Sequence, residues 1–305
     1  MPGGELRFDG QAIVVTGAGR GIGRAQALLL ASRGARVIVA DNGSAMDGSS
    51  ASTDPASEVV SQIAATGGEA QAHREDLATQ AGATGAVAAA LDAFGRIDGI
   101  VHYASPCPAP TPITESPDAE MELLLAVNPQ AAARMARAAW PHMAKQGYGR
   151  IVLAPSAAIY GAAGNTAYAA AKAALVGIVR CLAVDGAAHG ITVNGVLPSA
   201  SSRMTDAFLP EDYRQWFAER MPPEKVANAA VWLVSEECTA NGELFAIGAG
   251  RIARVTLAEA DGLPGVADSP EAARDAFNEV RADTRLSYPA NLDERTAHVG
   301  KLLGD

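Results

Sequence analysis

A glycine-rich turn between two short apolar runs constrains the possible fold more than any other feature of this chain. The turn, Thr16-Gly-Ala-Gly-Arg-Gly-Ile-Gly23, follows the apolar residues 12–16 and precedes residues 24–33, which have helical composition. A second β-branched run, residues 36–40, ends at Asp41. A strand, a tight turn, a helix and a strand in this order predict two parallel neighbouring strands joined by a right-handed helical crossover.

The alternation of strands and helices continues along the chain. Further strands are expected at residues 70–74, 97–103, 150–154, 191–197 and 243–247, the last of the series, and helices at 56–66, 82–94, 121–143 and 166–187. Residues 42–55 are rich in Ser, Gly and Asp and are expected to form a loop. Because parallel strands alternating with helices are covered on both faces, the pattern predicts an α/β fold with a doubly wound parallel sheet of Rossmann type.

This domain is expected to span residues 1–250. The polar residues 251–305 are predicted to form a C-terminal extension with one helix near 269–284. The extension packs on the domain or on a neighbouring subunit; the alternative is a partly disordered tail.

Composition and charge exclude several classes of function. The net charge of −10 argues against nucleic acid and anionic membranes as partners. Cys107, Cys181 and Cys238 show neither close pairing nor metal-ligand spacing, so idle thiols in a reducing compartment and no metal site are expected. With no signal-peptide stretch and no uninterrupted apolar run of transmembrane length, the chain is predicted to be soluble and cytoplasmic.

The segment Tyr168-Ala-Ala-Ala-Lys172 carries the strongest chemical signal. Residues four apart on a helix share one face, so the Tyr and Lys side chains are expected to meet. A free phenol has a pKa of about 10 and is a poor base at neutral pH. At about 4 Å and an effective dielectric of about 20, an ammonium stabilises a phenolate by about 4 kcal/mol, or about three pKa units. The pair therefore predicts that Tyr168 acts as an acid or base.

The glycine turn predicts a dinucleotide site. Gly17, Gly21 and Gly23 let the backbone approach a pyrophosphate, whose charge is favoured at a helix N-terminus. Asp41, at the end of the next strand, is placed to accept hydrogen bonds from the adenosine ribose and to repel a 2′-phosphate. Arg20 argues the other way, because a guanidinium could receive that phosphate. We favour Asp41 and expect NAD to bind at least about tenfold tighter than NADP.

Two residues after the third strand complete this side of the site. Asp76 and Leu77 are expected to border the adenine. For Asp76, an equal alternative is that it caps the following helix.

Together these residues resemble the short-chain dehydrogenase/reductase family. The matching features are the glycine turn, Asn128, Ser156, Tyr168 with Lys172, and Pro198. A closer similarity is to the (3R)-hydroxyacyl-CoA dehydrogenase domain of multifunctional enzymes of type 2. It rests on Ala138-Ala-Trp-Pro-His-Met143, Tyr148-Gly-Arg-Ile151, Ile159-Tyr-Gly161, Ser202-Arg-Met-Thr205 and Asn241-Gly-Glu-Leu-Phe-Ala-Ile-Gly-Ala-Gly250.

The resemblance implies roles for particular residues. Tyr168 would be the acid/base, Lys172 would lower its pKa and hold the nicotinamide ribose, Ser156 would bind the reacting oxygen, and Asn128 would hold a relay water. The cofactor would also lie against Ile22, Ala104, Pro198 and Thr205. The resemblance further implies a homodimer or homotetramer, with the helices at 121–143 and 166–187 at the interface.

Three departures from the family pattern stand out. His102-Tyr-Ala-Ser105 replaces the usual Asn-Asn-Ala-Gly, which restricts the backbone near the cofactor and adds the bulky ring of Tyr103. His102 is either a general base or a hydrogen-bonded strand-end residue. Ser156 lies 12 positions before Tyr168, one fewer than usual, so either a shorter loop still delivers its hydroxyl or the site lacks one. Pro129, inside the predicted long helix, either frees a carbonyl beside Asn128 or only bends the helix.

The segment 199–221 gives the only indication of the substrate. Its apolar side chains, four of them aromatic, favour either a lid over an apolar substrate or a helix packed by its apolar face. No basic cluster marks a site for coenzyme A phosphates, although Arg203 is a candidate. The sequence thus predicts an NAD-dependent dehydrogenase for a (3R)-hydroxyacyl-CoA-like alcohol; the alternatives are a steroid or other secondary-alcohol dehydrogenase and a non-catalytic nucleotide-binding module.

Overall fold

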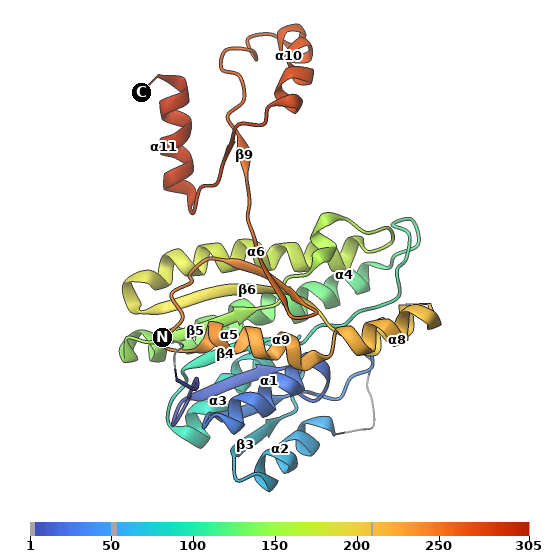
Figure 1. Cartoon of the computed structure of the whole chain (residues 1–305), viewed down its shortest axis with the longest axis vertical. Coiled ribbons are helices and arrows are strands. Elements are labelled where there is room, and N and C mark those ends of the chain that lie inside the picture. Colours follow the sequence, from blue (N-terminus) through green and yellow to red (C-terminus); the bar gives the residue numbers. More distant parts are fainter. Residues whose placement is uncertain (1–3, 50–53, 209, 305) are drawn as a thin grey trace. The chain divides into compact units, whose positions relative to one another are not determined.

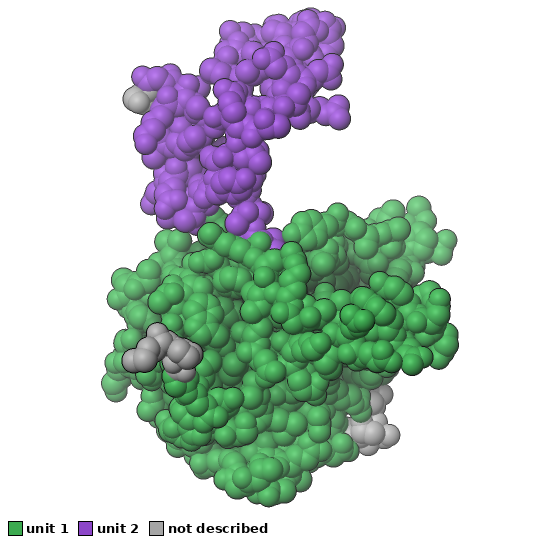
Figure 2. Space-filling model, in the orientation of Figure 1, with its two compact units in different colours: residues 1–254 green, residues 255–305 purple. Residues whose placement is uncertain are grey.

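The computed structural model describes residues 4–49, 54–208 and 210–304. The chain separates into two compact units, residues 1–254 and 255–305 (Figure 2). The extension predicted from residue 251 begins with a strand that belongs to the sheet of the first unit.

An eight-stranded sheet forms the centre of the first unit. Its strands are β1 (Ala12–Thr16), β2 (Arg36–Ala40), β3 (Glu69–His73), β4 (Gly99–His102), β5 (Gly149–Leu153), β6 (Ile191–Ser199), β7 (Leu244–Gly248) and β8 (Arg251–Val255). They lie in the order β3-β2-β1-β4-β5-β6-β7-β8, and β1 to β7 pair in parallel. This confirms the predicted doubly wound, Rossmann-type fold.

Helices cover both faces of this sheet. The helices of this unit are α1 (Gly21–Ser32), α2 (Pro55–Ala65), α3 (Gln80–Phe94), α4 (Asp118–Leu125), α5 (Ala131–Gln146), α6 (Thr166–Gly186), α7 (Arg203–Phe208), α8 (Glu211–Arg220) and α9 (Pro223–Ala230). Their ends follow local capping chemistry. At the start of α2 the Asp54 side chain accepts a hydrogen bond from the Ser57 N–H. At the start of α3 the Thr79 side chain accepts one from the Gly82 N–H, and Gly95 ends α3 in the left-handed conformation.

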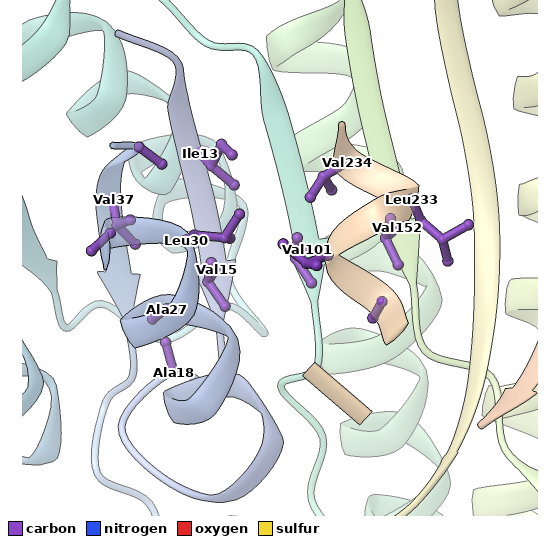
Figure 3. Close-up of a cluster of buried hydrophobic side chains, with 14 of the residues drawn as sticks. Ile13, Val15, Ala18, Ala27, Leu30, Val37, Val101, Val152, Leu233 and Val234 are labelled. Atoms are coloured by element: carbon purple, nitrogen blue, oxygen red, sulfur yellow. The ribbon is translucent and has the colours of Figure 1, made fainter. Parts of the chain in front are cut away.

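The main core lies on the face covered by α1, α2 and α9. Alternate strand residues such as Ile13, Val15 and Val101 point to this face, where they meet Leu30 of α1 and Val234 (Figure 3). Helices α1 and α9 run side by side over it (Figure 1). Because strand side chains alternate, this packing sets the register that brings Thr16 beside Ala40 of β2 and His102 of β4.

The helix predicted at 121–143 is interrupted. Residues Ala126–Gln130 form a π-helical turn between α4 and α5, with Pro129 inside it. Proline has no N–H to complete an α-helical bond, and the Ala131 N–H reaches back five residues to the Ala126 carbonyl instead. The single long helix is therefore wrong; the chain changes its hydrogen-bond pattern at this point rather than only bending.

The C-terminal region holds more structure than the sequence predicts. Strand β7 is not the last: the turn Ala249–Gly250, with both φ angles positive, leads into β8. A two-residue connection joins antiparallel strands, so β8 is antiparallel to β7. The second unit contains a ribbon of β9 (Glu259–Ala260) and β10 (Leu286–Ser287) with the helices α10 (Pro270–Ala282) and α11 (Leu292–Leu303). Helix α10 corresponds to the one helix predicted near 269–284, and α11 is a second helix that was not predicted.

Among the described residues, the stretch Thr166–His189, which includes α6, is long and apolar enough to cross a membrane. Lys172, Arg180 and Asp185 interrupt this stretch, so it is not the uninterrupted apolar run whose absence the sequence predicts. Lys172, in the middle of α6, is buried and donates a hydrogen bond to the Ala154 carbonyl, as in a helix packed on its own sheet. Length and composition alone do not distinguish the two settings.

Candidate active site

The glycine turn lies where the sheet reverses its direction of winding. Strand β1 has β2 on one side and β4 on the other, and in open α/β sheets ligands bind beyond the strand carboxyl ends at such a point. A Cβ on Gly17 would lie 2.9 Å from the Ala104 nitrogen, and one on Gly23 would lie 2.2 Å from the Gly17 carbonyl oxygen. The turn thus closes only with glycine at these two positions.

The same turn leaves the start of α1 open to a ligand. Gly21 has φ +51°, and beyond its own helical turn no atom of the described residues lies within 4 Å of the Cβ it lacks. The N-cap Arg20 places no side-chain acceptor on the α1 N–H groups, and the first turn holds no acidic residue. Free N–H groups beside open space suit a pyrophosphate. The residues present therefore fit a dinucleotide.

Asp41 lies directly beside this turn. Its Oδ2 accepts from the Gly19 N–H at 2.9 Å and its Oδ1 from the Gly43 N–H at 2.8 Å. A carboxylate has about four acceptor sites, so this arrangement orients Asp41 and leaves capacity for ribose hydroxyls.

Asp76 and Leu77 follow β3. Asp76 accepts from the Ala78 N–H in a tight turn, while Thr79 caps α3, so the alternative that Asp76 is the helix cap is wrong. Leu77 is buried. Their contact with an adenine stays a prediction.

Tyr168, Lys172 and Ser156 come together. The Lys172 Nζ lies 5.5 Å from the centre of the Tyr168 ring, as expected for one face of α6. The Ser156 side chain lies close enough to the Tyr168 phenol to interact with it, and its hydroxyl accepts from the Ala158 N–H at 3.2 Å. The shorter spacing therefore still delivers the hydroxyl, because the turn Ala157–Tyr160 is wound as a 3₁₀ helix capped by Ser156.

The electrostatics of this pair differ from the expectation. Burial raises the pKa of Tyr168 to about 12, and the hydrogen bond from Ser156 only partly opposes this. Burial also lowers the pKa of Lys172 to about 7. The predicted lowering of the Tyr168 pKa by an ammonium is thus wrong for the protein groups alone. The lysine is itself too deeply buried to hold its charge firmly.

Cys107 is a neighbour that sequence reasoning missed. Burial raises the pKa of its thiol, and it interacts electrostatically with Lys172 and Tyr168. Its N–H donates to the Met46 carbonyl at 2.7 Å. Since the thiol lies far from both residues in sequence and in no motif, no local signal could have found it.

Asn128 is fully buried in the π-helical turn. Its Nδ2 donates to the Leu124 carbonyl at 2.9 Å, whereas its Oδ1 has no hydrogen-bond partner among the described residues. An unpaired buried acceptor is costly, so this oxygen fits a bound water.

His102 ties this turn to the glycine turn. Burial lowers its pKa to about 4, so the ring is neutral. Its Nε2 lies 3.0 Å from the Val127 carbonyl oxygen and its Nδ1 2.7 Å from the Thr16 hydroxyl, which in turn accepts from the Ala104 N–H. A carbonyl can only accept, so Nε2 carries the proton and Thr16 donates to Nδ1. His102 is therefore the hydrogen-bonded strand-end residue and not a general base.

Tyr103 adds a buried phenol at the next position. Its hydroxyl has no partner among the described residues, and burial raises its pKa. The ring packs against the main core, and Ala104, one residue on, lies against Gly17. The segment His102-Tyr-Ala-Ser105 therefore still places the backbone of Ala104 against the glycine turn.

The segment after β6 folds into the two short helices α7 and α8. Pro198 lies within β6, and the Thr205 hydroxyl both accepts from the Ser202 N–H and donates to the Ser202 carbonyl, each at 2.8 Å. On α8 the rings of Tyr213 and Trp216 stack at 5.2 Å. Both side chains are exposed, so α8 is not packed into the core by its aromatic residues.

Known proteins are similar to this chain along most of its length. It is 38% identical over 303 residues to peroxisomal multifunctional enzyme type 2 of Mus musculus, covering 98% of this chain and 40% of the mouse protein. It is 40% identical over 263 residues to a short-chain type dehydrogenase/reductase of Mycobacterium tuberculosis, covering 86% and 89% of the two chains. A solved structure of 7α-hydroxysteroid dehydrogenase with NADH and 7-oxo glycochenodeoxycholic acid superposes with a TM-score of 0.71 at 29% identity, covering 80% and 95%.

The family model described as short chain dehydrogenase matches residues 11–212. This range includes the glycine turn, Asn128, Ser156 and the Tyr168–Lys172 pair. Members are oxidoreductases that bind a nicotinamide cofactor. By this match and by its fold, the chain belongs to the short-chain dehydrogenase family.

Proposed function

We propose that the protein is an NAD-dependent dehydrogenase that interconverts a secondary alcohol and a ketone on a (3R)-hydroxyacyl-CoA-like substrate. One observation carries the proposal: a phenol beside a serine side chain lies on the same helix face as a buried lysine, in a family that binds nicotinamide cofactors. The similarity to multifunctional enzyme type 2 supports the substrate class. The similarity to a hydroxysteroid dehydrogenase supports the alternative, a steroid or other secondary alcohol.

Each residue has a part in the proposed chemistry. When bound, oxidised nicotinamide supplies the hydride acceptor and a positive charge beside the site. Tyr168 takes the alcohol proton during oxidation and returns it during reduction. Ser156, whose side chain interacts with Tyr168, holds the reacting oxygen within reach of the phenol. Lys172, with a pKa of about 7, gains or loses a proton at neutral pH, and the unpaired Oδ1 of Asn128 holds the relay water.

The preference for NAD rests on Asp41. Its carboxylate is oriented by two backbone N–H groups at the end of β2, where the adenosine ribose of a dinucleotide is expected. A 2′-phosphate there would meet a like charge. We therefore expect NAD to be favoured over NADP.

We also propose a cytoplasmic homodimer or homotetramer. The exposed face of α6 is a row of small and apolar residues that includes Ala173, Gly177, Cys181 and Val184, the last 57% exposed. Small side chains permit another helix to approach closely. The second unit also has apolar surface to cover: among its described residues, 255–304, none is buried.

Replacing the Tyr168 phenol tests the proposed function. Tyr168→Phe removes the proposed proton carrier, so we expect a loss of at least about 10²-fold in kcat with 3-hydroxyacyl thioesters and unchanged binding of NADH. Tyr160→Phe is the matched control, because that phenol is 72% exposed and has no lysine four residues later. Full activity of Tyr168→Phe contradicts the assignment. Binding without turnover by the unsubstituted protein, on thioesters and hydroxysteroids alike, favours a non-catalytic module.

A further inference from the structure

Arg203 lies far along the sheet from the residue it contacts. It is the first residue of α7, in the segment that follows β6, and its Nη1 lies 3.4 Å from the carbonyl oxygen of Ser44, in the loop that follows β2. In the sheet, β1, β4 and β5 separate β2 from β6. Strands lie about 4.8 Å apart, so four steps span about 19 Å. The segment after β6 therefore folds back across the carboxyl ends of these strands to the glycine-turn side of the sheet.

Arg203 also lies within electrostatic range of a second arginine and of a carboxylate there. Arg203 interacts electrostatically with Arg20 of the glycine turn and with Asp41. Partial burial first, and then Arg20, lower the pKa of Arg203, while Asp41 raises it. Both oxygens of Asp41 already accept backbone N–H groups. Arg203 thus has a second guanidinium group and one oriented carboxylate within electrostatic range, in a chain whose net charge is −10.

The single carboxylate of Asp41 does not balance two guanidinium groups, so a further anion is favoured at this point. Like charges at short range repel, and the open N-terminus of α1 adds further positive potential. A phosphate bound at this point would accept hydrogen bonds from the α1 N–H groups and from guanidinium groups, which match phosphate geometry. The glycine turn is built for a backbone approach to phosphate, so such an anion is available in the cofactor itself.

We propose that Arg203, together with Arg20, binds a phosphate group of the bound dinucleotide from the side of the α7 segment. The pyrophosphate is the favoured group, because a 2′-phosphate would lie against Asp41. Arg203 then serves the cofactor rather than the phosphates of coenzyme A, the site for which the sequence made it a candidate. The inference rests on the dinucleotide site and not on which alcohol is oxidised.

Binding measurements on Arg203→Gln test this assignment. We expect NADH and ADP-ribose to bind about 10- to 100-fold more weakly, as for loss of a hydrogen bond between charged groups, by fluorescence and calorimetric titration. If Arg203 binds the pyrophosphate, the affinity for NADPH should fall by the same factor. If Arg203 binds the 2′-phosphate instead, only the affinity for NADPH should fall. Arg203→Lys, which keeps the charge, should recover part of the affinity.

A control variant separates this effect from a general loss of positive charge. Arg220→Gln removes an exposed arginine from α8, in the same segment, and should leave all three affinities unchanged. Unchanged binding of NADH, NADPH and ADP-ribose by Arg203→Gln would overturn the proposal. The proposal would also fail if a titration with coenzyme A showed weaker binding while these three affinities stayed the same. Either result would leave the Tyr168 assignment standing, because neither measurement involves turnover.

Discussion

At the scale of single residues, burial outweighs pairwise attraction around Tyr168. A lysine on the same helix face predicts a stabilised phenolate, yet the surroundings raise the pKa of Tyr168 to about 12 and lower that of Lys172 to about 7. Removing a group from water disfavours its charged form, whichever sign the charge has. Without a cofactor, the protein therefore favours the uncharged forms of both Tyr168 and Lys172. A positively charged cofactor ring would favour the phenolate of Tyr168.

Lys172→Met should change how stability depends on pH. The folded-state pKa of Lys172 is about 7 against an ordinary value of 10.5, so between these values the unfolded chain holds a proton that the folded chain does not. The contribution of neutral Lys172 to stability is therefore present above pH 10.5 and is lost as pH falls towards 7. We expect the free energy of unfolding to rise from pH 7 to 9.5 more steeply than in Lys172→Met.

Urea titrations at several pH values would measure this difference. Lys145→Met, on the exposed end of α5, is the control and should keep the slope of the unsubstituted protein. Parallel profiles for Lys172→Met and the unsubstituted protein would show that Lys172 stays charged in the folded state.

At the scale of elements, one histidine connects three parts of the fold. His102 ends β4, accepts from Thr16 at the end of β1 and donates to Val127 in the π-helical turn that holds Asn128. Pro129 lacks the N–H that a regular helix would need, and His102 donates to the carbonyl of Val127, two residues before this proline. The position of Asn128 thus depends on a strand that lies beside the turn and not only on the helix that contains it.

His102→Phe should destabilise the protein. It fills similar space but leaves the Thr16 hydroxyl and the Val127 carbonyl without the partner each now has, at a cost of about 1–3 kcal/mol for each buried group. His102→Asn, the family residue, has both a donor and an acceptor and should cost less. Urea unfolding at neutral pH measures both variants. Equal stability of His102→Phe and the unsubstituted protein would contradict the proposed hydrogen-bond chain.

At the scale of the whole molecule, two apolar surfaces lack a covering partner within their own unit. One is the exposed row on α6; the other is on the C-terminal unit, where Phe277, Leu292 and Leu303 are each more than 60% exposed. Two helices and a two-stranded ribbon without a buried residue are too small to be stable alone. Both observations favour assembly with further copies of the chain.

Gly177→Arg should disrupt that assembly. Apart from the neighbouring backbone of α6, no atom of residues 4–49, 54–208 and 210–304 lies within 4 Å of a Cβ at Gly177, so the arginine fits the single subunit but blocks an approaching helix. We expect light scattering to show a dimer or tetramer for the unsubstituted protein and a monomer for this variant, with unchanged circular dichroism. Ala88→Arg, exposed on α3, is the control and should assemble normally. A monomeric unsubstituted protein would contradict the proposal.

Local patterns in the sequence were enough for the fold and for part of the site. The strand and helix periodicities predicted the parallel sheet, and helix geometry placed Tyr168 and Lys172 on one face. The same patterns failed where the outcome depended on distant residues. They left open whether Ser156 reaches the phenol, and they missed the π-helical turn and helix α11.

By itself, then, the sequence determined the doubly wound sheet, the glycine turn beside Asp41 and the shared face of the tyrosine and lysine. These depend on backbone sterics and on side-chain periods of two and about 3.6 residues, which act within a few positions. Only the tertiary structure decided the neutral state of His102, the lowered pKa of Lys172 and the reach of Arg203 across the sheet. Desolvation and long-range charge depend on what the fold places around a group, and those neighbours lie tens to more than a hundred residues away in the chain.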